Sequence, residues 1–328
     1  MVACLFSASY FGDKKHKRNS TLSYLMATKN PKTGNYILLF IGIFCISWSA
    51  ILVKLADVTG IASGFYRLFF GTLAIIPFWL YYKKPIADRK GVMIAVICGL
   101  LFGADIALWN TSIMLSKASI STLLANLAPV WVGLGALLFM KEKPGKVFWL
   151  GTFIALAGVV MIVGTRQIFG SQLNLGNGLA ILASVFYGAY LLTVRKGRST
   201  LDTFSFTTIS MLSSTVMLGV ISLIAGVPMW GFSATSWWAL VALDIVPQVI
   251  GWLAINQALG HISPDVASVS LLSQTVFTAI FSVPVLHEYL SFAEMLGAVV
   301  VLFGIFLVNR PKLPRRKPKK PLMPQLID

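Results

Sequence analysis

One segment of this chain occurs twice. Residues 108–163 align without a gap on residues 254–309. The alignment places identical residues at equivalent breaks: Asn110 on Asn256, Glu142 on Glu288, Gly151 on Gly297 and Gly158 on Gly304. Both copies have the same order of segments. An apolar run is followed by a polar break, a second apolar run that ends near the Glu, and a third apolar run that contains the glycines. The chain is therefore expected to fold as two related halves.

The composition predicts a polytopic membrane protein. Of the 328 residues, 57% are hydrophobic and only 12% are charged, and the mean hydropathy is +0.80. A span needs roughly 17–25 apolar residues and must be helical, because the bilayer core offers backbone groups no water. Ten such spans are expected, at residues 36–56, 62–82, 91–115, 118–140, 147–165, 176–194, 204–226, 235–257, 266–286 and 293–309.

The basic residues predict the orientation of these spans. Alternate loops and the two tails carry 23 of the 27 Lys and Arg residues, and the exceptions are Lys54, Arg67, Lys117 and Arg166. By the positive-inside rule both termini are expected in the cytoplasm. The net charge of +16 then reflects topology, so nucleic acid is not an expected partner.

An odd number of spans per half inverts the second half relative to the first. We therefore expect an all-α membrane protein whose ten transmembrane helices form two inverted five-helix repeats, an arrangement typical of alternating access. The expected organisation is a basic tail (1–35), a first repeat (36–165), a second repeat (176–309) and a basic, Pro-rich tail (310–328), with both tails cytoplasmic and disordered. Met26 is an alternative start to Met1.

Several motifs resemble the EamA-type transporters of the drug/metabolite transporter superfamily. They are SWSAILVKL, FYRLFFGTLAIIP, ANLAPVWVGLGALLFMKEK, GTFIALAGVV and a looser VFYGAYLLTVRK. The resemblance implies transport, with the first, third, fourth, sixth, eighth and ninth helices lining a central cavity, and the lack of an ATP site makes any transport by this chain alone secondary. The second copy departs from the family pattern, because Gln274-Thr275 stands where an acidic residue and Pro are usual. The two halves are therefore not expected to gate identically.

Two carboxyls inside predicted spans are the strongest functional candidates, since ionisable groups are expensive in a bilayer. Asp105 shares a helix face with Trp109, and Asp244 shares one with Gln248 and Trp252. These stripes suit a cavity that binds an amine or a cation, and a proton. The alternative is that each acid pairs with a base such as Arg67 or Lys54, or hydrogen-bonds a neighbouring helix. Arg67 itself resembles the family's arginine in the second helix, where charge pairing and substrate binding are both open.

Uncharged residues form a second set of candidates. Asn126 precedes the helix-breaking Pro129, and the resemblance makes Asn126 and Gln274 substrate contacts, with an interhelical hydrogen bond as the alternative for each. Trp48 and Tyr187, at matching places in the two halves, are candidate cavity walls, although plain packing is favoured for both.

Other recurring residues favour structural roles. Glu142 and Glu288 are expected to cap a helix or pair with nearby bases. The seven-residue spacing of the glycines predicts close helix packing, either within the bundle or in a homodimer. Cys4, Cys45 and Cys98 lack metal-type spacing, and His261 and His287 lie near span ends. We find no nucleotide-binding loop, zinc spacing or hydrolase elbow, so neither an enzyme nor a cofactor or metal is expected.

The sequence predicts a secondary transporter, and the resemblance alone favours a bacterial inner membrane. The expected substrate is a small polar metabolite, an amino acid or related amine, and export is favoured from the resemblance alone. One alternative is uptake or exchange of a nucleoside-like or nucleotide-linked metabolite. An alternative of another class is a membrane scaffold that transports nothing.

Overall fold

The computed structural model describes residues 31–82, 88–116, 118–163, 174–286 and 291–310, and these residues form helices joined by short connections. Nine helical segments in this part are long and apolar enough to cross a membrane, and Leu123–Phe139 is a shorter apolar segment. These segments are the ten expected spans. Glu288 and His287 lie outside the described residues, as do most of both tails, apart from residues 31–35, which are helical, and Arg310.

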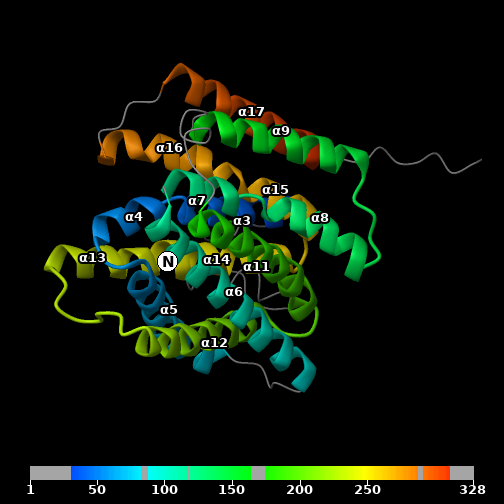
Figure 1. Ribbon diagram of the computed structural model, residues 1–328. Coiled ribbons are helices and arrows are strands. Elements are labelled where there is room, and N and C mark those ends of the chain that lie inside the picture. Colours follow the sequence, from blue (N-terminus) through cyan, green and yellow to red (C-terminus); the bar gives the residue numbers. More distant parts are fainter. Residues whose placement is uncertain (1–30, 83–87, 117, 164–173, 287–290, 311–328) are drawn as a thin grey trace, which may run out of the picture.

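The helices follow the repeat (Figure 1). The first half contains α3 (Pro31–Ile46), α4 (Ser49–Ala56), α5 (Gly60–Tyr82), α6 (Arg89–Leu115), α7 (Ala118–Ala125), α8 (Ala128–Phe139) and α9 (Lys146–Val163). The second contains α11 (Leu175–Arg198), α12 (Thr203–Ile224), α13 (Ala234–Leu243), the π-helical segment η1 (Asp244–Gly251), α14 (Trp252–Leu259), α15 (Pro264–Leu271), α16 (Ser273–Leu286) and α17 (Phe292–Asn309). Helix α3 starts at Pro31, five residues before the predicted boundary, and Pro is well tolerated in the first turn of a helix.

Four spans are irregular near their middle. The first is interrupted between α3 and α4, the fourth between α7 and α8, the ninth between α15 and α16, and the eighth contains η1. Pro129 in the first turn of α8 and Pro247 inside η1 each lack a backbone N–H. Irregular backbone at membrane depth is tolerated where protein groups or a cavity satisfy it. At the first break, the Thr278 hydroxyl donates to the Ser47 carbonyl at 2.7 Å.

The repeat glycines bring α9 and α17 into backbone contact. A Cβ on Gly158 would lie 2.5 Å from the Val301 nitrogen, and one on Gly151 would lie 2.7 Å from the Gly304 oxygen. Gly297 meets the Gly158 oxygen in the same way, at 2.8 Å. The two helices lie side by side in Figure 1. The predicted close packing therefore occurs within the bundle.

The two halves are interlocked. Span three (α6) packs against α11 and α12 of the second half, and span eight (α13, η1 and α14) packs against α3, α4 and α5 of the first. This exchange follows the two-fold relation of the repeats. It brings the polar stripes of α6 and of η1 to the region between the halves.

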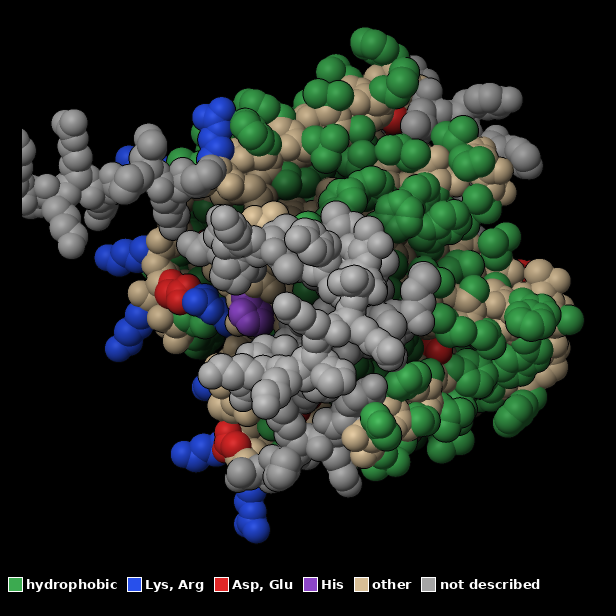
Figure 2. All heavy atoms as spheres, turned by 180° about the vertical axis from the view of Figure 1, so that it is seen from behind, with side chains coloured by type: hydrophobic (Ala, Val, Ile, Leu, Met, Phe, Trp, Pro, Cys, Tyr) green, Lys and Arg blue, Asp and Glu red, His purple; other side chains and the backbone are tan. Residues whose placement is uncertain are grey.

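The surface is that of a membrane protein. Large apolar side chains are exposed along the helices, among them Leu73, Phe139, Leu223 and Phe303. Figure 2 shows apolar side chains over the upper and right-hand parts of the visible face, with Lys and Arg gathered at the left end. Lipid contact explains this exposure, because apolar surface is stable in hydrocarbon.

Candidate functional site

A charged cluster lies between the halves. Arg67 of α5, which is 9% exposed, donates from Nε to the Gln248 Oε1 at 2.7 Å. Its guanidinium interacts electrostatically with the carboxyls of Asp105 and Asp244. The only direct salt bridge between described residues lies elsewhere, so both carboxyls act on Arg67 without touching it. We call Arg67, Asp105, Asp244 and Gln248 the central cluster.

A glycine allows α5 to approach η1 closely. Gly71 lies one turn after Arg67, on the same face. A Cβ at Gly71 would lie 2.5 Å from the Asp244 Oδ1 and 3.2 Å from the Gln248 Cγ. A larger residue would therefore push η1 away from α5. Gly71 thus sets the distance over which Arg67 reaches Gln248.

Four buried polar atoms around the cluster have no hydrogen-bond partner. They are the Asp244 Oδ1, the Gln248 Nε2, the Trp252 Nε1 and the Trp109 Nε1. Asp244 and Gln248 are each 1% exposed. Buried polar groups are normally paired, and leaving one unpaired costs about 1–3 kcal/mol. Unpaired donors and an acceptor gathered on two facing spans are typical of a site that a ligand completes.

The two carboxyls differ in exposure. Asp105 is half-buried, whereas Asp244 is buried in the irregular backbone of η1. π-helical segments inside longer helices occur frequently at functional sites. More of Asp105 than of Asp244 is therefore exposed.

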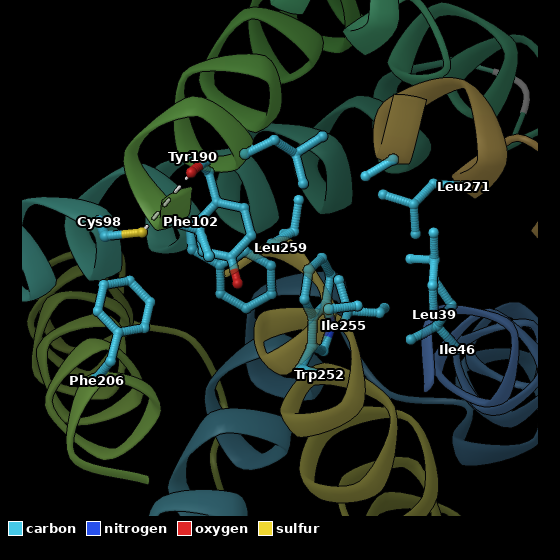
Figure 3. Close-up of a cluster of buried hydrophobic side chains, with 14 of the residues drawn as sticks. Leu39, Ile46, Cys98, Phe102, Tyr190, Phe206, Trp252, Ile255, Leu259 and Leu271 are labelled. Carbon is cyan, nitrogen blue, oxygen red and sulfur yellow. Dashed lines mark hydrogen bonds between the residues drawn. The ribbon is translucent and has the colours of Figure 1, made fainter. Parts of the chain in front are cut away.

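Aromatic rings pack beside the cluster. The Trp252 ring lies 5.3 Å from Tyr190 and 4.8 Å from Phe102, and Tyr187 lies 6.1 Å from Trp252. Figure 3 shows Tyr190, Phe102 and Trp252 in contact. The Tyr190 hydroxyl donates to the Asn256 Oδ1 at 2.9 Å. These rings give the region between the halves a firm apolar wall.

Not all the sequence candidates join this cluster. The Asn126 Nδ2 donates to the Thr275 Oγ1 at 3.2 Å, which ties the break in the fourth span to that in the ninth. The Trp48 ring stacks on Phe281 at 4.7 Å. Trp48 therefore belongs to a different aromatic group from Tyr187, although the repeat relates them. Gln274 is half-buried just after the ninth-span break.

Arg67 is the residue whose importance the sequence left open. Its contact with Gln248 spans 181 positions, so no local pattern could reveal it, and its position inside an apolar span was the available signal. Glu142 pairs with Arg195 at 3.1 Å, as expected for a structural residue. Within the described parts of the chain, no group of three His, Cys, Asp or Glu residues is placed to hold a metal.

Comparison with known proteins gives relatives that share both halves of this fold. The chain is 25% identical to an uncharacterized transporter of Archaeoglobus fulgidus over 85% of this chain and 98% of the relative. It is 24% identical to the uncharacterized transporter YdfC of Bacillus subtilis (81% and 87% covered). It is also 24% identical to the pseudopaline exporter CntI of Pseudomonas aeruginosa (81% and 90% covered).

A solved crystal structure has the same fold. It superposes with a TM-score of 0.73 at 18% identity, covering 84% of this chain and 96% of that one. The EamA-like transporter family model matches residues 33–164 and again residues 174–310. With both halves matched, this multi-pass membrane protein belongs to the EamA-like transporter family.

Proposed function

We propose that this transporter moves an amino acid or a related small amine, and that the central cluster binds it. The main support is that one guanidinium and two carboxyls interact electrostatically between the halves, next to buried polar atoms that lack hydrogen-bond partners. An amino acid carries one group of each charge. Arg67 would receive the carboxylate, for which a guanidinium is well shaped, and Asp105 would receive the ammonium.

The unpaired donors support this orientation. The Gln248 amide is held through its oxygen by Arg67, which leaves its Nε2 free to donate. The indole nitrogen of Trp252 lies one turn further along the same face. A substrate carboxylate would accept from these groups and remove the penalty of leaving them unpaired.

The proposed mechanism is alternating access without ATP, in which one inverted half moves against the other. We place the protein in an inner membrane with both termini in the cytoplasm. The described Lys and Arg gather at one end of the face seen in Figure 2, as the positive-inside rule expects of the cytoplasmic end. We favour export, a direction supported by the relative that is named as a pseudopaline exporter.

Uptake or exchange of a nucleoside-like or nucleotide-linked metabolite is the second candidate. A phosphate-bearing substrate favours several Arg or Lys groups. The described side chains of the central cluster supply one, Arg67, together with two carboxyls of the opposite sign. This balance favours the amine-bearing substrate. A non-transporting scaffold would show no saturable flux.

The first experiment measures thermal stability of the purified protein with amino acids, amines, nucleosides and nucleotide derivatives. A ligand that binds only the folded state raises stability by mass action, by about 2.7 kcal/mol at a hundredfold excess over Kd. We expect a concentration-dependent shift with amino acids or amines. Shifts confined to nucleoside derivatives would favour the second candidate.

Variants then test whether the central cluster is the site. Arg67→Gln and Asp105→Asn should abolish both the shift and the flux into liposomes. Asp57→Asn is the matched control, because it also removes a carboxyl, and Asn tolerates the positive φ of 47° there. Full flux in Asp105→Asn would place the site elsewhere.

A further inference from the structure

The central cluster contains two carboxyls but one guanidinium. The carboxyls of Asp105 and Asp244 both interact electrostatically with Arg67. If all three groups were ionised, the cluster would carry one surplus negative charge inside the bilayer. Such a charge is expensive and requires a neutralising partner.

Asp244 is the more deeply buried of the two carboxyls. It is 1% exposed, and its Oδ1 packs against Gly71 without a hydrogen-bond donor. Of the titratable side chains described on the helices around η1, Arg67 is the charged one that faces it. The Cys45 side chain of α3 packs on Gly251, the Tyr66 hydroxyl of α5 donates to the Met229 carbonyl, and α13 and α14 contain no titratable residue. A proton is the remaining neutralising partner.

We infer that Asp244 holds an exchangeable proton while Asp105 is ionised beside Arg67, so that the two carboxyls have separate tasks. Asp105 takes the substrate's cationic group, and Asp244 carries the proton. In the ligand-free cluster the charges of Arg67 and Asp105 cancel and Asp244 is neutral.

The assignment fixes how substrate and proton are coupled, and this step rests on the proposed function. When a substrate with net charge +1 binds at Asp105, the O–H bond of Asp244 breaks and its proton leaves to solvent. The site then holds two positive and two negative charges, so its total charge is unchanged. A zwitterion adds no net charge and would leave the proton in place. The cluster therefore exchanges one proton for one monocationic amine.

Infrared difference spectroscopy of the purified, full-length protein tests the assignment without any substrate. At neutral pH we expect the carbonyl stretch of a protonated carboxyl, shifted downward in deuterated water. The band should be lost in Asp244→Asn and should keep its frequency in Asp105→Glu, which preserves the negative charge beside Arg67. Asp265→Asn is the matched control and should keep it, because its Oδ1 is also buried without a partner but lies at the start of α15.

Absence of the band in the wild type, its survival in Asp244→Asn, or a shift of its frequency in Asp105→Glu would overturn the assignment. Asp244→Glu keeps an ionisable group, so it should retain the carbonyl band at a shifted frequency. It therefore shows whether loss of the band in Asp244→Asn is due to removal of the carboxyl rather than to misfolding. Ethylammonium chloride, compared with sodium chloride, should remove the band, and its persistence would overturn the exchange step. Failure of every amino acid and amine to stabilise the protein would instead count against the proposed function, and leave the proton assignment standing.

Discussion

The helices α8 and α16 are related by the repeat, and each follows a mid-span break, yet they pack differently. In α8, six residues are buried: Ala128, Pro129, Val132, Gly133, Gly135 and Ala136. In α16, no described side chain after Val276 is buried. Equivalent segments of the repeat therefore pack to different degrees.

The cause lies in residue size. Gly135 of α8 contacts Leu192 of α11, and a Cβ on Gly188 of α11 would lie 2.8 Å from the Trp131 Cβ. The repeat places Phe281 where α8 has Gly135, and that ring stacks on Trp48. Packing of α8 therefore relies on glycines that leave room for neighbouring side chains, whereas α16 packs through stacked rings.

The largest expected effect is from Gly188→Ala. The new methyl group would press on the Trp131 Cβ, at 2.8 Å, and on the Ala128 oxygen, at 3.3 Å. Overpacking of this kind destabilises by about 1–3 kcal/mol. Thermal unfolding should show a lower Tm.

The control is Gly178→Ala on the same helix, where nothing lies within 4 Å of the added Cβ. For this variant we expect the free energy of unfolding to rise by about 0.4–1 kcal/mol. Equal behaviour of the two variants would show that α8 does not depend on the glycine contact.

Cysteine labelling compares the two sides directly. Val132 and Thr278 are repeat-related, but Val132 is fully buried and Thr278 is half-buried. In a background with Cys4→Ser, a maleimide should modify Thr278→Cys faster than Val132→Cys by roughly tenfold, equivalent to a difference of about 1.4 kcal/mol in local opening. The native thiols of Cys45 and Cys98 are buried and set the background rate. Equal labelling rates at both positions would contradict the difference in packing between α8 and α16.

A third prediction concerns the hydrogen bond from the Trp131 Nε1 to the Ser184 Oγ, at 2.7 Å. Trp131→Phe and Ser184→Ala should each lower the unfolding free energy, and a double-mutant cycle should return a coupling of about 0.5–1.5 kcal/mol, as expected for one net hydrogen bond. Thr278→Val, which removes the bond to the Ser47 carbonyl, measures the α16 side. A coupling near zero would mean that glycine contact alone holds α8 in place.

Much of this architecture follows from local patterns. Apolar runs locate the spans, and the spacing of Gly151 and Gly158 predicts their packing face, because both features depend on residues close in sequence. Asp105 and Asp244 stand out because charge is rare in apolar helices. The joining of Arg67 to Gln248 and the separation of Trp48 from Tyr187 depend on contacts between distant segments. No periodicity encodes such contacts, and they require the folded chain.

The smallest expected effect is from the salt bridge at the end of α8. Glu142 and Arg195 lie 3.1 Å apart, but their side chains are 49% and 36% exposed. Solvent screening limits such pairs to about 0.2–1 kcal/mol. Glu142→Gln should therefore lower stability slightly at low salt and negligibly at high salt, and a cycle with Arg195→Gln isolates the pair from other effects of either change. Because the glycine contacts between α8 and α11 remain in every member of this cycle, a salt-sensitive loss larger than that of Gly188→Ala would mean that charge, rather than small-residue packing, contributes most to holding α8 in place.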